Sequence, residues 1–226
     1  MPHLTRATPS SRGVPDRALL DLLEELEAGG LDPHALVVTR HGDVVLETAW
    51  EPWDTDRASL VYSVSKTVTA LAVGLLVGDG LLTLDDPVDA HLDLPNPHGL
   101  TVRHLLGMVT GHDREQTLAM PLTAEALLTT PLRHAPGGHF AYSSPASWVL
   151  SVLVTEITGE RVGEVVRPRI LEPLGIGARW WRRQGELDQG FSGLHLTALD
   201  LARLTLLVAD RGRWRGRQLV PAAFVD

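Results

Sequence analysis

Residues 63–77 are apolar at nearly every position, and this run limits the folds that the chain can adopt. Helices that are apolar on all sides are buried in a protein core rather than laid along its surface. Gly78-Asp79-Gly80 ends the run, which gives the predicted helix a defined stop. The rest of the chain has to cover this helix. Its 226 residues, 44% of them apolar, suffice for one sizeable core or a main core with a smaller neighbour.

Periodicity and turn residues predict the elements around this central helix. Leucines at helical spacing predict an amphipathic helix over residues 15–27, which Gly29-Gly30 ends. Two runs rich in β-branched residues, 35–40 and 44–50, are separated by His41-Gly42-Asp43, a sequence typical of a hairpin turn. Further helices are predicted at 101–108, 123–129, 145–158, 162–171 and 197–209.

Two helix starts carry capping signals, and one charged segment is assigned to a loop. Ser144 before Pro145 is predicted to be the N-cap of the following helix, with proline at its first position. Thr197 and Asp200 have the spacing of a capping box. Asp113-Arg114-Glu115 is predicted to be a solvated loop.

The two ends of the chain are interpreted from composition. Residues 1–14 are polar and are predicted to be a disordered tail without a secretory signal, which favours a cytoplasmic location. Residues 211–217 alternate arginine with glycine and tryptophan, a pattern that predicts a hairpin. Residues 221–226 are typical of the first turns of a helix, and we interpret the chain as a truncated product.

The overall charge and the lack of cysteine exclude several classes of function. With 20 Lys+Arg against 28 Asp+Glu, the net charge of −8 is unsuited to binding nucleic-acid phosphates. Without cysteine the chain can form neither a disulfide nor a thiolate zinc site. The histidines closest in sequence, His98 with His104 and His134 with His139, are predicted to be surface or capping residues. We therefore predict no metal, no cofactor, and no nucleic-acid or membrane partner.

The chain contains a single lysine, Lys66, three positions after Ser63 at the start of the apolar helix. Arginine stays protonated in proteins, whereas a desolvated lysine can lose its charge and activate a hydroxyl group. Spacing of i and i+3 places both side chains on one helix face, and Ser65 between them points elsewhere. Ser63 is therefore the candidate nucleophile and Lys66 its activating group. The alternative is a helix-starting serine beside a solvated lysine.

The position of Ser63 also bears on the stabilisation of negative charge. If Ser63 lies in the first helical turn, its own N–H has no acceptor within the helix, and the helix dipole favours an anion there. Such an N–H can form half of an oxyanion hole.

Tyr142, one of only two tyrosines, follows Pro136-Gly137-Gly138 and precedes a predicted helix start. A phenol presented from such a turn towards Ser63 can accept its proton, provided that a neighbouring ammonium lowers the phenol pKa from about 10. The alternative is a half-buried tyrosine with its hydroxyl at the surface.

These residues and their surroundings resemble the serine β-lactamase and penicillin-binding protein superfamily, in its class C-related branch of carboxypeptidases, esterases and amide hydrolases. The resemblance runs from about residue 15 to the end of the chain. Its matching segments are Ser63-Val64-Ser65-Lys66, 80–88, 102–106 with Thr110-Gly111, Pro136-Gly137 with Tyr142, 173–176 and 197–203. It implies acylation of Ser63, proton transfers shared by Lys66 and Tyr142, and release of the acyl group by water.

The resemblance also implies an α+β fold of the β-lactamase/transpeptidase type. In this fold an antiparallel sheet carries flanking helices and an inserted helical domain, and the site lies in the cleft between them. We expect the tail at 1–14, the first part of the sheet domain at 15–66, a mainly helical domain at 67–210, and the start of the return to the sheet at 211–226. The late strands of the sheet are missing from this chain.

Two departures from the family pattern concern the site. Ser144 occupies the position of an asparagine in the second motif, which makes it the candidate substrate-binding residue with a shorter side chain. The third motif, Lys-Thr-Gly or a histidine-bearing variant on a strand that supplies a second oxyanion N–H, is absent.

Taken together, the sequence predicts a serine hydrolase of a small-molecule amide, ester or lactam that works through a covalent acyl intermediate on Ser63. The substrate class remains this broad because the loop side chains that set specificity carry no motif. The alternative is a non-catalytic or inactive relative that binds a peptide-like or lactam ligand without turnover.

Overall fold

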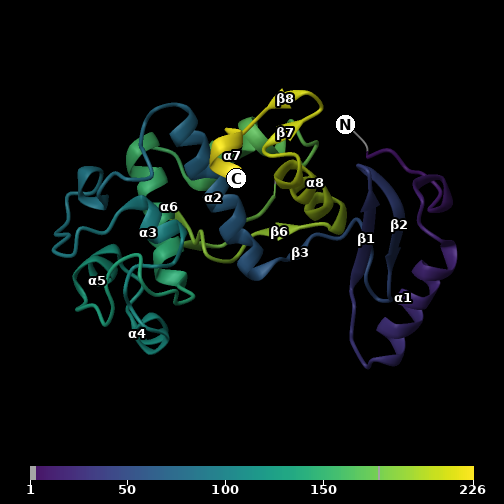
Figure 1. The fold of residues 1–226 in the computed structure, drawn as a ribbon, viewed down its shortest axis with the longest axis horizontal. Helices are drawn as coiled ribbons and strands as arrows, with labels where there is room; N and C mark the ends of the chain where they lie inside the picture. Colours follow the sequence, from purple (N-terminus) through teal and green to yellow (C-terminus); the bar gives the residue numbers. More distant parts are fainter. Residues whose placement is uncertain (1–3, 178) are drawn as a thin grey trace.

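Helix α2 (Ser65–Gly78) lies at the centre of the computed structural model, which describes residues 4–177 and 179–226 (Figure 1). It packs against α6 (Ser144–Thr158), α7 (Val162–Val166) and α9 (Ala222–Val225). Nine residues of α2 are buried, which confirms the prediction of a helix covered on most sides. Ser63 lies just before it, in the 3₁₀ turn η2 (Tyr62–Val64).

A group of shorter helices surrounds α6 at one end of the molecule. Helices α3 (Val102–Leu106) and α5 (Ala124–Thr129) pack directly on α6. The chain also forms η3 (Val88–Ala90) and the π-helical turn η4 (Arg167–Leu171), which continues α7. The helices predicted at 101–108, 123–129, 145–158 and 162–171 are confirmed, with boundaries that shift by one to a few residues.

Residues 113–115, predicted to be a loop, instead begin helix α4 (Arg114–Ala119). The Asp113 carboxylate accepts a hydrogen bond from Gln116 N at 2.8 Å, and Asp113 N donates to the Gln116 side chain at 3.1 Å. This reciprocal capping box satisfies two main-chain donors that a helix start leaves unpaired, so the segment is helical.

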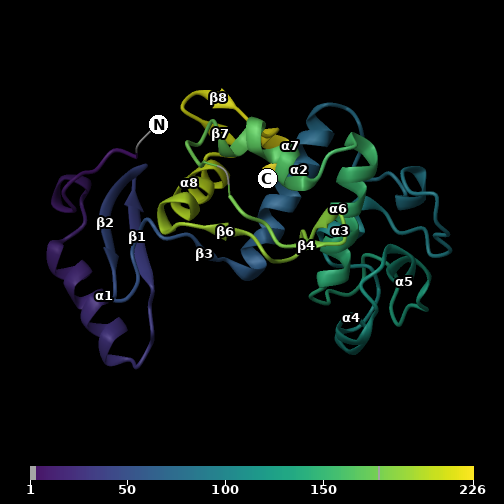
Figure 2. The same ribbon diagram turned by 180° about the vertical axis from the view of Figure 1, so that it is seen from behind.

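The predicted hairpin is confirmed at the other end of the molecule. Strand β1 (Ala35–Arg40) pairs antiparallel with β2 (Asp43–Ala49), with Ala35 opposite Ala49 and an irregularity between Val38 and Thr39. Helix α1 (Asp16–Ala28) runs along the hairpin, and α8 (Ala198–Ala209) packs against β1. Figure 2 shows from behind that α1 and the hairpin lie at one end, α3 to α5 at the other, and α2 between them.

The expectation of a disordered N-terminal tail is wrong for residues 4–14, and residues 1–3 lie outside the described part. Val44 N donates to Thr5 O at 2.8 Å and Ala7 N donates to Val44 O at 3.0 Å, so the segment pairs with the outer edge of β2. Leu4 is buried, and the 3₁₀ turn η1 (Ser10–Arg12) follows. The unpaired main-chain groups of a strand edge favour such pairing, which composition does not reveal.

Three small antiparallel sheets complete the fold. Strand β3 (Ser59–Leu60) pairs with β6 (His195–Leu196), and β4 (Arg183–Gln184) pairs with β5 (Leu187–Asp188). The predicted hairpin at 211–217 is confirmed as β7 (Arg213–Trp214) and β8 (Arg217–Gln218). Because β3 leads directly into η2, its pairing with β6 fixes where α2 begins.

Two predictions on helix starts have different outcomes. Thr197 and Asp200 form the predicted capping box of α8. The N-cap of α6 is Ser143 and not Ser144, since the Ser143 hydroxyl accepts the hydrogen bond from Ala146 N at 3.0 Å. Ser144 is the first residue of the helix itself. Among the described residues, no helix is both long enough and apolar enough to cross a membrane.

Candidate active site

Ser63 and Lys66 lie side by side at the start of α2. The Lys66 Nζ donates to Ser63 Oγ at 3.3 Å, and the Ser63 side chain is exposed. Tyr62, the residue before Ser63, has a φ of +43°, a conformation that non-glycine residues seldom adopt and that functional sites often hold. Ser65 points elsewhere, as its spacing predicts, and its buried hydroxyl donates to Tyr62 O at 2.6 Å.

A main-chain carbonyl holds the lysine in place. Lys66 Nζ donates to Phe191 O at 2.8 Å, a shorter contact than the one to Ser63. The same nitrogen lies 5.8 Å from the centre of the Phe191 ring, within the range of a cation–π contact. Sequence reasoning missed Phe191, because a carbonyl oxygen in a loop leaves no trace in residue type.

Tyr142 reaches the same point from a different part of the chain. Lys66 Nζ lies 4.7 Å from the centre of the Tyr142 ring, and the Tyr142 side chain is partly exposed. Main-chain bonds just before the tyrosine fix it to the turn after α3. Ala141 N donates to Met108 O at 3.1 Å, and Gly137 N donates to Val109 O at 2.7 Å. The structure therefore brings together Ser63, Lys66 and Tyr142, which are up to 79 positions apart in the sequence.

The electrostatics of the site act on the tyrosine. Burial alone raises the pKa of the Tyr142 phenol, because it disfavours the charged form. Hydrogen bonding to Lys66 and Ser63 and the charge of Lys66 outweigh this effect, so the pKa of Tyr142 lies below its ordinary value of 10.0. A phenol with a lowered pKa is a better proton acceptor at neutral pH than an ordinary tyrosine.

Ser144, the fourth residue predicted for the site, lies two positions after Tyr142 and is partly buried. Within the described residues its hydroxyl makes no hydrogen bond to Ser63, Lys66 or Tyr142. Its place at the first position of α6 keeps it near the tyrosine.

Residues 188–194, here called the floor segment, tie the site to both central helices. Thr69 Oγ1 on α2 donates to Gly190 O at 2.8 Å, and Ser151 Oγ on α6 donates to Asp188 O at 2.7 Å. Leu194 N donates to Ser65 Oγ at 3.2 Å. Gly190 has a φ of +63°, and a Cβ atom there would lie 2.7 Å from the Ser151 Cβ. The floor segment is therefore held closely, together with the carbonyl that positions Lys66.

Ser63 is also placed to stabilise negative charge with its own main chain. The first turn bond of η2 runs from Val64 N to Val61 O at 3.0 Å, so the N–H of Ser63 precedes the first bonded donor. Helix starts leave such donors without an acceptor inside the helix, and α2 directs the positive end of its dipole to the same point. This N–H can form one half of an oxyanion hole.

The histidine-rich region is built for packing and capping. The His104 ring accepts from Thr101 N at 3.1 Å in the capping box of α3, and the rings of His134 and His139 stack with centres 3.9 Å apart. Within the described residues, no group of three or more potential ligands is arranged to hold a metal ion.

Comparisons with known proteins agree on one family. A family model described as beta-lactamase matches residues 21–223. The chain is 28% identical over 163 residues to a D-aminopeptidase from Brucella anthropi, covering 62% of this chain and 31% of the relative. It is 27% identical over 134 residues to the esterase/beta-lactamase LipL from Mycobacterium tuberculosis, covering 55% of this chain and 31% of the relative. The chain thus spans about a third of the length of these curated relatives.

The solved structures give the same fold. The structure of a penicillin-binding protein homologue from Pyrococcus abyssi superposes with a TM-score of 0.73 at 20% sequence identity. The superposition covers 93% of this chain and 59% of that chain. The α+β fold of the β-lactamase/transpeptidase type, expected from the motifs, is therefore confirmed.

Proposed function

Because this chain belongs to the β-lactamase family, we propose that it is a serine hydrolase that forms a covalent acyl intermediate on Ser63. The observation that carries the proposal is the meeting of three side chains from distant segments. Lys66 Nζ lies 3.3 Å from Ser63 Oγ and 4.7 Å from the centre of the Tyr142 ring. A neighbouring amine and a phenol with a lowered pKa can supply the base that activates a serine hydroxyl.

In the proposed reaction Ser63 Oγ attacks the carbonyl carbon of the substrate, and its proton passes to the Tyr142 oxygen. Lys66 stabilises the phenolate beforehand and hydrogen-bonds to Ser63 Oγ, while the carbonyl of Phe191 fixes its position. The oxyanion of the tetrahedral intermediate is stabilised by the N–H of Ser63.

The intermediate then collapses, and the proton balance is restored in two steps. The bond from the carbonyl carbon to the leaving amine or alcohol breaks, and that group takes the proton from Tyr142. Water next attacks the acyl ester, gives a proton to Tyr142, and releases the acid as Ser63 recovers its proton. Neither step needs a redox group or another reactant besides water.

The proposed substrates are small amides, esters or lactams. Two relatives bear the names D-aminopeptidase and esterase/beta-lactamase, and both names refer to the cleavage of acyl bonds. The exposed Ser63 and the partly exposed Tyr142 leave the reacting hydroxyl open to a substrate of this size. Ser144, close to Tyr142, is the proposed contact to the substrate's polar groups.

The test is acylation by a chromogenic p-nitrophenyl ester and a chromogenic cephalosporin, followed by intact mass spectrometry. We expect a mass increase equal to one acyl group, and Ser63→Ala abolishes it. Thr67→Ala, which removes an exposed hydroxyl of α2 one residue after Lys66, is the matched control and keeps the adduct. An adduct of unchanged yield in Ser63→Ala would overturn the proposal.

One sequence observation favours a second candidate function. Ser144 stands in place of the asparagine of the family pattern. Its shorter hydroxyl replaces a carboxamide that both donates and accepts hydrogen bonds, which favours a site that binds a ligand without turnover. Saturable binding of the cephalosporin with neither a burst nor steady release would support this alternative, and turnover would exclude it.

A further inference from the structure

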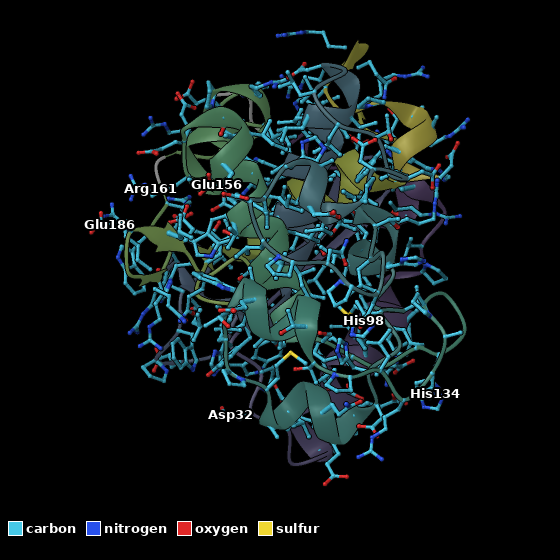
Figure 3. The ribbon with its side chains drawn as sticks, turned by 90° about the vertical axis from the view of Figure 1, so that its left-hand side faces the viewer. Asp32, His98, His134, Glu156, Arg161 and Glu186 are labelled. Carbon is cyan, nitrogen blue, oxygen red and sulfur yellow. The ribbon has the colours of Figure 1, made fainter. Side chains whose placement is uncertain are left out.

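A cavity of about 470 Å³ lies beside α7 and η4. We call it the arginine–tryptophan pocket after the residues that dominate its lining, Arg161, Arg167, Arg179, Arg183, Trp180 and Trp181. Its volume falls within the ~300–1,000 Å³ range of small-molecule sites. Figure 3 shows Arg161 at one side of the molecule together with Glu186, while His98 and His134 lie on the other side of the view.

Two of the four arginines already have acidic partners. Arg161 pairs with Glu164, and Arg161 N also donates to the Glu164 carboxylate at 3.0 Å. Arg179 pairs with the buried Asp200 at 2.6 Å. Both guanidinium groups are therefore fixed in place by a carboxylate.

The other two arginines have no such partner. Arg167 on η4 and Arg183 on β4 are exposed, and neither forms an ion pair with any residue in the described ranges. Two of the four arginines that line the pocket therefore carry a charge that no ion pair among the described residues offsets, in a chain whose net charge is −8. Unpaired positive charge in a cleft attracts ligands of the opposite sign.

The second carboxylate of the lining, Asp188, forms no ion pair with the arginines in the described part of the chain. Asp188 is buried, and it accepts a hydrogen bond from Gly163 N at 2.8 Å. Burial raises the pKa of its carboxyl group, although the Gly163 bond and the charges of Arg161 and Arg183 act in the opposite direction. Asp188 therefore serves to tie β5 to α7.

The aromatic part of the lining is open to solvent. Trp180 is 60% exposed, and its ring makes an edge contact with His195 at 4.6 Å between centres. Trp181, the next residue, is buried, and its Nε1 donates to Ser192 O at 2.8 Å. An exposed tryptophan on a firmly held base is a surface on which a flat ligand ring can stack.

The pocket is separate from Ser63, and the floor segment lies between the two sites. On one side of this segment Phe191 O accepts from Lys66, and on the other side Ser192 O accepts from Trp181. Asp188 and Leu194, at the two ends of the segment, line the pocket. A ligand in the pocket therefore leaves the nucleophile free.

From these observations we propose that the arginine–tryptophan pocket binds a small aromatic carboxylate. The carboxylate lies between Arg167 and Arg183, whose planar guanidinium groups match its two oxygens. The ring stacks on Trp180, and Leu171 and Leu194 supply the apolar wall. This site goes beyond the proposed hydrolysis, since its ligand is bound without a chemical step.

The test is isothermal titration calorimetry with 2-naphthoate, carried out on the Ser63→Ala variant so that no acylation can occur. We expect saturable binding at one site. Arg167→Gln/Arg183→Gln weakens it by about tenfold or more, as expected for the loss of charge-assisted hydrogen bonds. Arg40→Gln/Arg114→Gln removes the same charge from exposed arginines outside the pocket and leaves binding unchanged.

Two further ligands separate the contributions of charge and ring. The neutral 2-naphthamide should bind about tenfold more weakly than 2-naphthoate, and inorganic phosphate should also bind more weakly because it cannot stack. Equal affinity for phosphate and 2-naphthoate would overturn the aromatic part of the proposal. Absence of saturable binding, or equal affinity in the pocket and control variants, would overturn the site as a whole. Because Ser63 is absent throughout, these outcomes do not depend on the proposed hydrolysis.

Discussion

The helical part of the molecule, which is built around α2 and α6 and is called the helical end below, differs from the hairpin end in how deeply its elements are buried. Helices α2 and α6 each contain nine buried residues, whereas α1 contains one and β1 none. The candidate site takes its residues from the start of α2, the start of α6 and the floor segment that both helices hold. Close packing fixes side-chain positions, so the precision that acylation requires is available at the helical end.

The hairpin end contributes differently. Strand β2 buries Val44 and Val45, while the leucines Leu20 and Leu22 of α1 remain exposed. The hairpin end connects to the site through β3, which pairs with β6 and leads into η2, and through α8, which packs against β1. We therefore expect changes in the hairpin to affect the site weakly.

The largest expected contrast is in stability. Leu153 in α6 is 1% exposed, and Leu153→Ala should lower the free energy of unfolding by about 2–5 kcal/mol. Leu36→Ala in β1, where the side chain is only half buried, should cost at most about 2 kcal/mol. Urea unfolding followed by circular dichroism measures both values. Equal losses of stability in the two variants would contradict the difference in packing between the helical end and the hairpin end.

A smaller contrast is expected between two glycines, one in the floor segment and one outside it. Gly190→Ala forces a Cβ to 2.7 Å from Ser151, at a residue whose φ is +63°. Gly185→Ala is the matched control, because its φ of +59° is similar and nothing lies within 4 Å of a Cβ there. The control should lose about 1–2 kcal/mol from backbone strain alone. Gly190→Ala should lose about 1–3 kcal/mol more and acylate more slowly, and identical losses would show that the segment is loosely held.

Direct titration of the phenol sharpens the comparison within the site. Since the chain has two tyrosines, Tyr62→Phe leaves Tyr142 as the only one that contributes to phenolate absorbance. The midpoint should lie below 10.0, because Lys66 and Ser63 stabilise the charged form more than burial disfavours it. Adding Lys66→Met should raise the midpoint. A midpoint that is unchanged by the loss of Lys66 would show that Lys66 does not lower the pKa of Tyr142.

The smallest effect concerns acid stability at α7. Hydrogen bonds from the side chain and main chain of Arg161 lower the pKa of Glu164 from 4.5 to about 2. This stabilisation is fully present above pH 4.5 and is lost as the pH falls through about 2. Glu164→Gln should therefore flatten the fall in stability in this pH range, by a small amount because the pair is partly exposed. Urea unfolding midpoints of both proteins between pH 5 and 2 measure this difference. Identical pH profiles for Glu164→Gln and the unsubstituted protein would show that the Glu164–Arg161 pair does not contribute to acid stability.

Much of the fold was predictable because local patterns determine it. The apolar run of α2 and the β-branched strands around His41 and Gly42 are confirmed, and the resemblance to the β-lactamase superfamily is confirmed by the family model. The predictions that failed concern main-chain pairing between distant segments and the choice between two neighbouring residues that can both cap a helix. Ser143 and Ser144 are both good caps, and only the geometry selects the first. Residues 4–14 join β2 through main-chain bonds that carry no side-chain signal.

In the candidate site, too, the local features could be predicted from the sequence and the tertiary contacts could not. The spacing of Ser63 and Lys66 predicts their contact, because residues three apart share a helix face. The capping box of Asp113 and Gln116 was readable in the sequence but was interpreted as a loop. Phe191 could not be found, since it acts through its carbonyl oxygen across 125 residues of sequence separation. The arginine–tryptophan pocket likewise depends on tertiary contacts between α7, η4 and the segment before β4.

The most direct measurement of the central claim is peptide mapping of the protein after brief reaction with the p-nitrophenyl ester. The account predicts that the acyl group is attached to Ser63, and that Tyr142→Phe and Lys66→Met each greatly slow its appearance without unfolding the protein. An acyl group found on any other residue, or formed at the same rate in both variants, would contradict it.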